Sequence, residues 1–225
     1  MVKGKRVLIT QVDAYMGEPI AEAFEEMGAE VIRSTSTLSS PEAAEETVLA
    51  AGEIDVLIAN FAEREWWSAL VQDIDDTQWL TYFDELVHPL MRIVRAVTPQ
   101  MITRGKGKIV AVTSAAPLRG IPKATGYCAA RGAQNAFVRA AGLELARNNI
   151  QFNAIAQNYV ENKTYYPPEL IANEEMMKRM LKVVPAGRLG KGEETAYFAA
   201  FLASAYSDFF VGQVFPFSGG WVTST

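Results

Sequence analysis

Residues 6–28 read RVLITQVDAYMGEPIAEAFEEMG, and this stretch decides the fold. Its first five residues are mostly apolar without alternation, which is typical of a short strand buried on both faces. Residues 18–28 show the spacing of a helix that Gly28 ends, and its apolar face consists of Ile20, Ala21, Phe24 and Met27. A buried strand that leads through a short turn into an amphipathic helix predicts the first unit of an α/β sheet.

The same alternation continues along the chain. Further short strands are predicted at 31–32, 55–59, 108–114 and 152–156, and helices around 77–101, 127–148 and 192–205. Apolar strands separated by helices predict a single-domain, doubly wound parallel sheet over residues 1–225, with right-handed crossovers and helices on both faces. Residues 157–174 are too rich in Tyr, Asn and Pro for a regular element. They follow the carboxyl end of a strand, where such sheets bind ligands.

Composition narrows the classes of function. The chain is 49% hydrophobic and 21% charged, as expected for a globular protein that is soluble. A net charge of −5 without a Lys or Arg run predicts no nucleic-acid partner. We find no secretory signal and no apolar run of membrane-spanning length, so no membrane association is expected. The single cysteine, Cys128, cannot form an internal disulfide, which favours the cytoplasm.

Several short motifs carry a family resemblance. They are Gly-Arg-Leu-Gly at 187–190, Phe-Leu-Ala-Ser at 201–204, Val-Gly-Gln at 211–213 and Ser-Gly-Gly at 218–220. With the order of strands and helices, they resemble the short-chain dehydrogenase/reductase superfamily over essentially the whole chain. The resemblance implies a Rossmann-like fold and an active site of Ser, then Tyr, then Lys four residues later. Ser114, Tyr127 and Arg131 stand at those places here, so the lysine has become arginine.

The cofactor site of that superfamily has changed in this sequence. Its phosphate turn, Thr-Gly-x-x-x-Gly-x-Gly, here reads Thr-Gln-Val-Asp-Ala-Tyr-Met-Gly at 10–17, so that one glycine, Gly17, remains to pack the helix against the turn. No acidic residue follows the second strand, where a ribose would bind, and Arg33 keeps open a contact with the 2′-phosphate of NADP. Phe61 and the pair Gln-Asn at 157–158 replace further residues that usually contact the cofactor. Together these changes indicate that the dinucleotide is no longer bound.

These departures resemble the halohydrin dehalogenases, which are related to short-chain dehydrogenases but use no nicotinamide. The resemblance implies that Ser114 holds the hydroxyl of a small vicinal haloalcohol, that Tyr127 removes its proton, and that the oxygen displaces halide to form an epoxide. Arg131 favours the Tyr127 phenolate, and the two side chains share a helix face because they are four residues apart. In reverse, the family opens epoxides with azide, cyanide or nitrite.

The remaining site predictions concern the pocket walls. The residues predicted to bind halide are Tyr15, Gln157, Asn158, Tyr159 and Tyr166, and those predicted to line the substrate pocket are Phe61, Trp66, Trp67, Pro117 and Ile121. Trp66 and Trp67 fit a subunit contact equally well, and Tyr15, Tyr159 and Tyr166 fit plain packing. We assign no cofactor-binding and no metal-ligating residues. The resemblance also implies a homotetramer, for which the alanine-rich helix at 127–148 offers a close-packing surface.

Two other functions fit the sequence. One is an NADP-dependent reductase in which Arg131 has replaced the lysine. The other is an inactive binding protein on the same fold, against which the intact Ser114 and Tyr127 argue.

Overall fold

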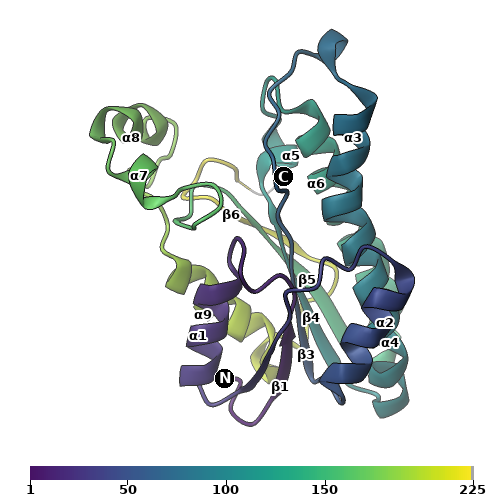
Figure 1. Cartoon of the computed structure of the whole chain (residues 1–225). Coiled ribbons are helices and arrows are strands. Elements are labelled where there is room, and N and C mark those ends of the chain that lie inside the picture. The colour runs from purple at the N-terminus through teal and green to yellow at the C-terminus, as the bar shows by residue number, and fades with distance from the viewer. Residues whose placement is uncertain (224–225) are drawn as a thin grey trace.

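The computed structural model describes residues 1–223 and contains one parallel sheet with helices on both faces (Figure 1). The strands are β1 (Arg6–Ile9), β2 (Glu30–Arg33), β3 (Val56–Asn60), β4 (Gly107–Ser114), β5 (Ile150–Gln157) and β6 (Val214–Phe217). They lie in the order β2-β1-β3-β4-β5-β6, and every neighbouring pair is parallel. The doubly wound α/β fold predicted from the sequence is therefore confirmed.

The helices divide between the two faces of the sheet (Figure 1). The helices are α1 (Gly17–Glu26), α2 (Pro41–Ala51), α3 (Asp76–Tyr82), α4 (His88–Arg104), α5 (Ala116–Arg119), α6 (Thr125–Leu145), α7 (Pro168–Ile171), α8 (Glu174–Leu181) and α9 (Gly192–Leu202). Helices α1 and α9 pack on each other over one apolar cluster, and α2, α4 and α6 cover the other. A π-helical turn, Phe83–Val87, joins α3 to α4.

The expected strands and long helices are found with their ends shifted by a few residues, whereas α2, β6 and the short helices α5, α7 and α8 were not predicted. Helix α2 was missed, although Ser40 caps it by accepting a hydrogen bond from the Ala43 amide and Pro41 begins it. Strand β6 was missed because it is an edge strand of four half-buried residues. The predicted irregular segment 157–174 is irregular only over 158–167, because residue 157 ends β5, α7 occupies Pro168–Ile171 and α8 begins at Glu174.

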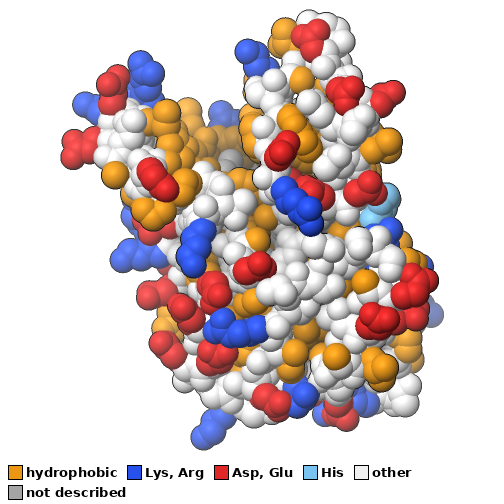
Figure 2. Space-filling model, viewed as in Figure 1, with side chains coloured by type: hydrophobic (Ala, Val, Ile, Leu, Met, Phe, Trp, Pro, Cys, Tyr) orange, Lys and Arg blue, Asp and Glu red, His pale blue; other side chains and the backbone are white. Residues whose placement is uncertain are grey.

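The fold creates a crevice at the carboxyl ends of the central strands. From β1 the chain first adds β2 on one side and then crosses to add β3 on the other. The strand order therefore reverses between β1 and β3, and doubly wound sheets bind ligands at such a point. The segments after β1, β3, β4 and β5 all reach this edge. Above it, α7 and α8 stand apart from α3, α5 and α6, and the hollow between them shows hydrophobic side chains (Figure 2).

No helix in the described part of the chain is both long and apolar enough to span a membrane.

Candidate active site

The serine and the tyrosine of the predicted triad line one cavity. Ser114 is the last residue of β4, and its Oγ accepts a hydrogen bond from the Ala116 amide at 3.1 Å. The Asn135 side chain on α6 donates to the Ser114 carbonyl at 3.2 Å, which ties the end of β4 to that helix. Tyr127 lies in the first turn of α6 and is buried. The close tie between β4 and α6 fixes the two hydroxyl-bearing side chains relative to each other.

Arg131 lies one turn further along α6 and is fully buried. Its Nη1 donates to the Gln134 side chain at 3.0 Å, and its Nη2 donates to the Phe61 carbonyl and to the Tyr165 hydroxyl, both at 3.0 Å. The guanidinium carbon lies 5.3 Å from the ring centre of Tyr127. The predicted shared face of Tyr127 and Arg131 is therefore observed.

The electrostatics of these groups favour a charged arginine beside a phenol. Burial raises the pKa of Tyr127 above its ordinary value, whereas the charge of Arg131 and hydrogen bonding with Ser114 and Arg131 lower it. Burial lowers the pKa of Arg131, but the surrounding phenols and Glu63 more than offset this, so its pKa lies well above the ordinary value. Arg131 thus acts as a permanent positive charge next to the Tyr127 ring.

One carboxylate and a second tyrosine complete the surroundings of Arg131. The Tyr165 hydroxyl donates to Glu63 Oε2 at 2.5 Å and accepts from Arg131. Glu63 Oε2 lies 3.7 Å from Arg131 Nη2, and both side chains are almost completely buried. Burial raises the pKa of the Glu63 carboxyl, while Arg131 and Tyr165 lower it.

Sequence reasoning missed Glu63 and Tyr165. Glu63 follows the end of β3, at the ligand-binding edge of the sheet, and this was the available signal. Tyr165 has an adjacent tyrosine, Tyr166, and both lie in an irregular segment. Without a helical or strand repeat, the sequence does not tell which of two neighbouring side chains points toward Arg131.

The turn after β1 has positive φ angles at two positions where the superfamily motif has glycine and this chain does not. Gln11 and Tyr15 occupy two glycine positions of the superfamily motif, and both have positive φ, 41° and 50°. Such a conformation costs a non-glycine residue about 1–3 kcal/mol. The Asn60 side chain secures the turn by donating to the Gln11 and Ala14 carbonyls and accepting from the Met16 amide. The conformation of the phosphate turn has therefore been retained while side chains were added to it.

Those added side chains fill the space above the turn. The Tyr15 hydroxyl donates to the Thr113 carbonyl at 3.1 Å, and its ring meets that of Tyr165 edge-on at 5.1 Å. Arg131 lies 5.4 Å from the Tyr15 ring centre. At the surviving glycine, Gly17, a Cβ atom would come within 2.4 Å of the Val12 backbone, so this glycine serves close packing of α1.

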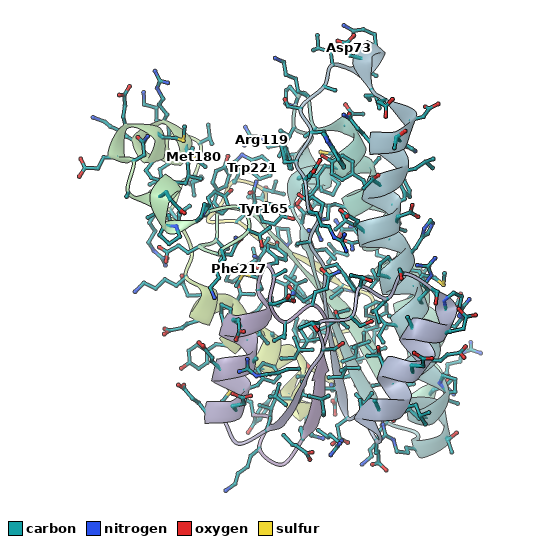
Figure 3. The ribbon with its side chains drawn as sticks, viewed as in Figure 1. Asp73, Arg119, Tyr165, Met180, Phe217 and Trp221 are labelled. Atoms are coloured by element: carbon teal, nitrogen blue, oxygen red, sulfur yellow. The ribbon has the colours of Figure 1, made fainter. Side chains whose placement is uncertain are left out.

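The segment after β5 forms the facing wall. Asn158 Oδ1 accepts hydrogen bonds from the Tyr159 amide and the Tyr166 hydroxyl, at 2.9 and 3.0 Å. Tyr159 has a positive φ of 57°, and its ring packs against those of Tyr166 and Trp221. Gln157 accepts from Thr195 on α9 at 3.1 Å. Figure 3 shows Tyr165, Trp221, Arg119 and Met180 around the opening between α8 and α5.

Together these walls enclose a cavity of about 390 Å³. Of the predicted site residues, those that line it are Ser114, Tyr127, Tyr15, Gln157, Asn158, Tyr159, Tyr166, Trp66 and Ile121. Arg131 lies behind Tyr127. Lining residues that were not predicted are Ala116, Val160, Asn162, Thr164, Tyr165 and Met180. The lining is mostly aromatic and apolar, with the two triad hydroxyl groups within it.

Three predicted wall residues lie outside this cavity. Phe61 is fully buried and contributes its carbonyl to Arg131. Trp67 packs edge-on against Tyr82, with ring centres 5.1 Å apart. Pro117 lies on α5 facing Gly132 of α6. Each of them supports the site from behind and does not line the cavity.

A nicotinamide dinucleotide does not fit these residues. The Tyr15 ring fills the space above the turn at which the superfamily's backbone approaches the pyrophosphate. Arg33 is paired with Glu18 and Glu25 at 2.7 and 3.0 Å, so it is engaged away from any 2′-phosphate. A second cavity on the β2 side is lined by one basic side chain, Arg64, and by more acidic ones, so that their combined charge repels phosphate; the acidic residues are Asp13, Glu63, Asp84 and Glu85. Within residues 1–223, no group of three or more metal-binding side chains is found.

Comparison with known proteins identifies the family. Residues 2–222 match the family model described as enoyl-(acyl carrier protein) reductase. A 3-oxoacyl-(acyl-carrier-protein) reductase of Thermotoga maritima is 31% identical over 85% of this chain and 76% of its own length. A 2-dehydro-3-deoxy-D-gluconate 5-dehydrogenase of Bacillus subtilis is 27% identical over 99% and 96%. The chain belongs to the short-chain dehydrogenase/reductase family.

Two solved structures are similar in both fold and sequence. One is described as a dehalogenation enzyme, with a TM-score of 0.90 and 31% identity over 98% of this chain and 99% of that one. The other is a halohydrin dehalogenase bound to ethyl (2S)-oxiran-2-ylacetate, with a TM-score of 0.87 and 25% identity over 97% and 98%. The sequence relatives are thus dehydrogenases and reductases, whereas these structural neighbours include dehalogenases.

Proposed function

We propose that this protein is a cofactor-independent halohydrin dehalogenase. The observation that carries the proposal is the Tyr15 ring, which fills the cofactor side of a cavity that still holds Ser114 and Tyr127. A reductase needs room there for a hydride donor. A displacement of halide within a single substrate needs a base, a hydroxyl to orient the substrate, and a place for the departing anion.

The reaction follows from these groups. The Ser114 hydroxyl binds the substrate hydroxyl, and the Tyr127 phenolate removes its proton as a general base. The resulting oxygen attacks the adjacent carbon, a C–O bond forms, and the carbon–halogen bond breaks with its electron pair leaving on the halide. Both reacting centres belong to one molecule, so proximity is already provided by the substrate. The products are an epoxide, a halide ion and a proton carried by Tyr127.

The halide leaves toward the wall formed by Tyr15 and by residues 157–159 and 166. Ring edges carry partial positive charge and suit a weakly hydrated anion. Run backward, the same site admits azide, cyanide or nitrite to open an epoxide ring. The two structural neighbours support this assignment, one through the name dehalogenation enzyme and the other through its bound epoxide ester. A homotetramer and a cytoplasmic location remain predictions.

The direct test is chloride release from 1,3-dichloro-2-propanol without added nicotinamide. We expect release by the unmodified protein and a fall of about 10²–10⁴-fold in Tyr127→Phe, because the general base is lost. Circular dichroism of the variant serves as the folding control. Absence of release from this substrate and from its bromo analogue, together with saturable NADPH binding, would replace the proposal with a reductase. No release and no NADPH binding would favour an inactive binding protein.

A further inference from the structure

Two buried charges of opposite sign lie behind the Tyr127 base, and a phenol separates them. Arg131 and Glu63 approach to 3.7 Å, which is too long for a hydrogen bond. The Tyr165 hydroxyl bridges them, donating to Glu63 at 2.5 Å and accepting from Arg131 at 3.0 Å. One hydroxyl therefore takes up the carboxylate oxygen that would otherwise bind the guanidinium directly.

We infer that Tyr165 is a positioning residue that keeps Glu63 from pairing directly with Arg131, so that the arginine charge remains available to the Tyr127 phenolate. This inference rests on the proposed role of Tyr127 as a base. The role is specific to Tyr165, because the hydroxyl of the neighbouring Tyr166 bonds to Asn158 instead.

The other contacts of Arg131 explain why the Tyr165 hydroxyl is needed to keep Arg131 and Glu63 apart. Arg131 is held from one side by Gln134, whose amide donates in turn to the Leu86 carbonyl in the π-helical turn. Nη2 donates to the Phe61 carbonyl and to the Tyr165 hydroxyl, and of these two partners only the hydroxyl also contacts Glu63. If the hydroxyl is removed, the buried carboxylate and the buried guanidinium attract each other and close the gap of 3.7 Å. The guanidinium then turns from Tyr127 toward Glu63.

The charges that face Tyr127 act in opposite directions. Arg131 lowers the pKa of Tyr127, and the Glu63 carboxylate raises it, both after the larger effect of burial. Tyr15, Tyr82 and Tyr165 also surround this cluster as neutral phenols, and Glu85 faces Glu63 from the outer side. Two substitutions at the bridge should consequently move the ionisation of Tyr127 in opposite directions.

The experiment is an ultraviolet titration of phenolate formation, in which Tyr127 is assigned by subtracting the curve of Tyr127→Phe. In Tyr165→Phe the ring that lines the cavity stays, the bridge is lost, and the Tyr127 midpoint rises by roughly one pH unit, the size expected for a displaced neighbouring charge. In Glu63→Gln an acceptor for Tyr165 remains but the negative charge is gone, so the midpoint falls. The matched control is Tyr166→Phe, which also removes a cavity hydroxyl and leaves the midpoint unchanged.

A midpoint in Tyr165→Phe equal to that of the unmodified protein, or an equal rise in Tyr166→Phe, would overturn the inference. If Glu63→Gln fails to fold, Tyr165→Phe and its control still decide the question. The titration needs no substrate, so it separates this inference from the proposed function. Chloride release is measured in parallel, and in Tyr165→Phe the pH of its half-maximal rate should rise together with the Tyr127 midpoint.

Discussion

The two walls of the cavity are built in different ways. The wall that carries Ser114, Tyr127 and Arg131 consists of the end of β4 and the first turns of α6, where regular hydrogen bonding and the helical repeat place the side chains. The opposite wall is irregular backbone with positive φ at Tyr15 and Tyr159, and the turn that carries Tyr15 also has a positive φ at Gln11. The first, rigid wall keeps the serine and the tyrosine of the superfamily pattern, with arginine in place of lysine, while the loops that face it depart further from that pattern, as expected when binding properties reside in loops on a fixed scaffold.

In the rigid wall, we expect the largest effect on rate and stability from replacing the buried Arg131. In Arg131→Met, Glu63 loses its positive neighbour and Tyr127 loses the charge that favours its phenolate. We expect dehalogenation to fall by about 10²–10⁴-fold. Stability should fall by about 3–5 kcal/mol, because one partner of a buried pair is left alone. Chloride release and urea unfolding measure the two effects.

The control for this variant is Arg139→Met, on the same helix but exposed. It should change stability by less than about 0.5 kcal/mol. A rate in Arg131→Met close to that of the unmodified protein would show that the chemistry does not depend on this wall.

The second prediction concerns how the rate of chloride release depends on pH through Tyr127. The base acts only when deprotonated, and burial raises the pKa of Tyr127 above its ordinary value. Activity should therefore increase with pH, by about tenfold per unit below the pKa of Tyr127, with no decline from its own titration at higher pH. Initial rates of chloride release between pH 6 and 10 test this. A rate independent of pH over that range would assign the limiting step to another group or to product release.

The irregular wall can be returned toward the superfamily motif by the double substitution Gln11→Gly and Tyr15→Gly. Both positions already have positive φ, so glycine fits the backbone. Loss of the Tyr15 ring should weaken bromide inhibition by about tenfold, comparable to the loss of one contact worth 1.4 kcal/mol. We expect no NADPH binding, because Asp13 and the paired Arg33 remain.

NADPH binding by this double variant in the micromolar range would contradict the view that the loops of the irregular wall no longer form a cofactor site. It would show that Tyr15 only fills an otherwise intact cofactor site. Isothermal titration of NADPH, with the single variant Gln11→Gly as reference, distinguishes the two outcomes.

The difference between regular elements and irregular loops also explains how much of each wall could be predicted from the sequence. The triad was predicted from the resemblance to short-chain dehydrogenases, and its convergence could be expected because a strand end and a four-residue helical spacing fix its geometry. The loop residues were predicted from their place after a strand and from the resemblance, and not from a pattern, since no repeat relates residue number to side-chain direction there. Tyr166 was expected near the anion and Tyr165 was not considered, yet Tyr165 contacts Arg131 and Tyr15. Glu63 was missed because its partners are distant in sequence.

The smallest predicted effect lies where the sequence could not choose between two adjacent side chains. Trp66 lines the cavity with its ring centre 4.8 Å from that of Tyr127, whereas Trp67 packs on Tyr82 behind the cavity. Trp66→Ala should raise KM for a haloalcohol several-fold, roughly the 1 kcal/mol of a half-exposed aromatic contact, with kcat nearly unchanged.

Trp67→Ala is the matched comparison, because it removes the same side chain one residue away. Its loss opens a gap against Tyr82 and should lower the melting temperature by several degrees, with KM unchanged. Steady-state kinetics and thermal unfolding of both variants separate the two roles. If Trp67→Ala raised KM more than Trp66→Ala, the substrate would have to enter on the Tyr82 side, and the cavity between the two walls would not be its binding site.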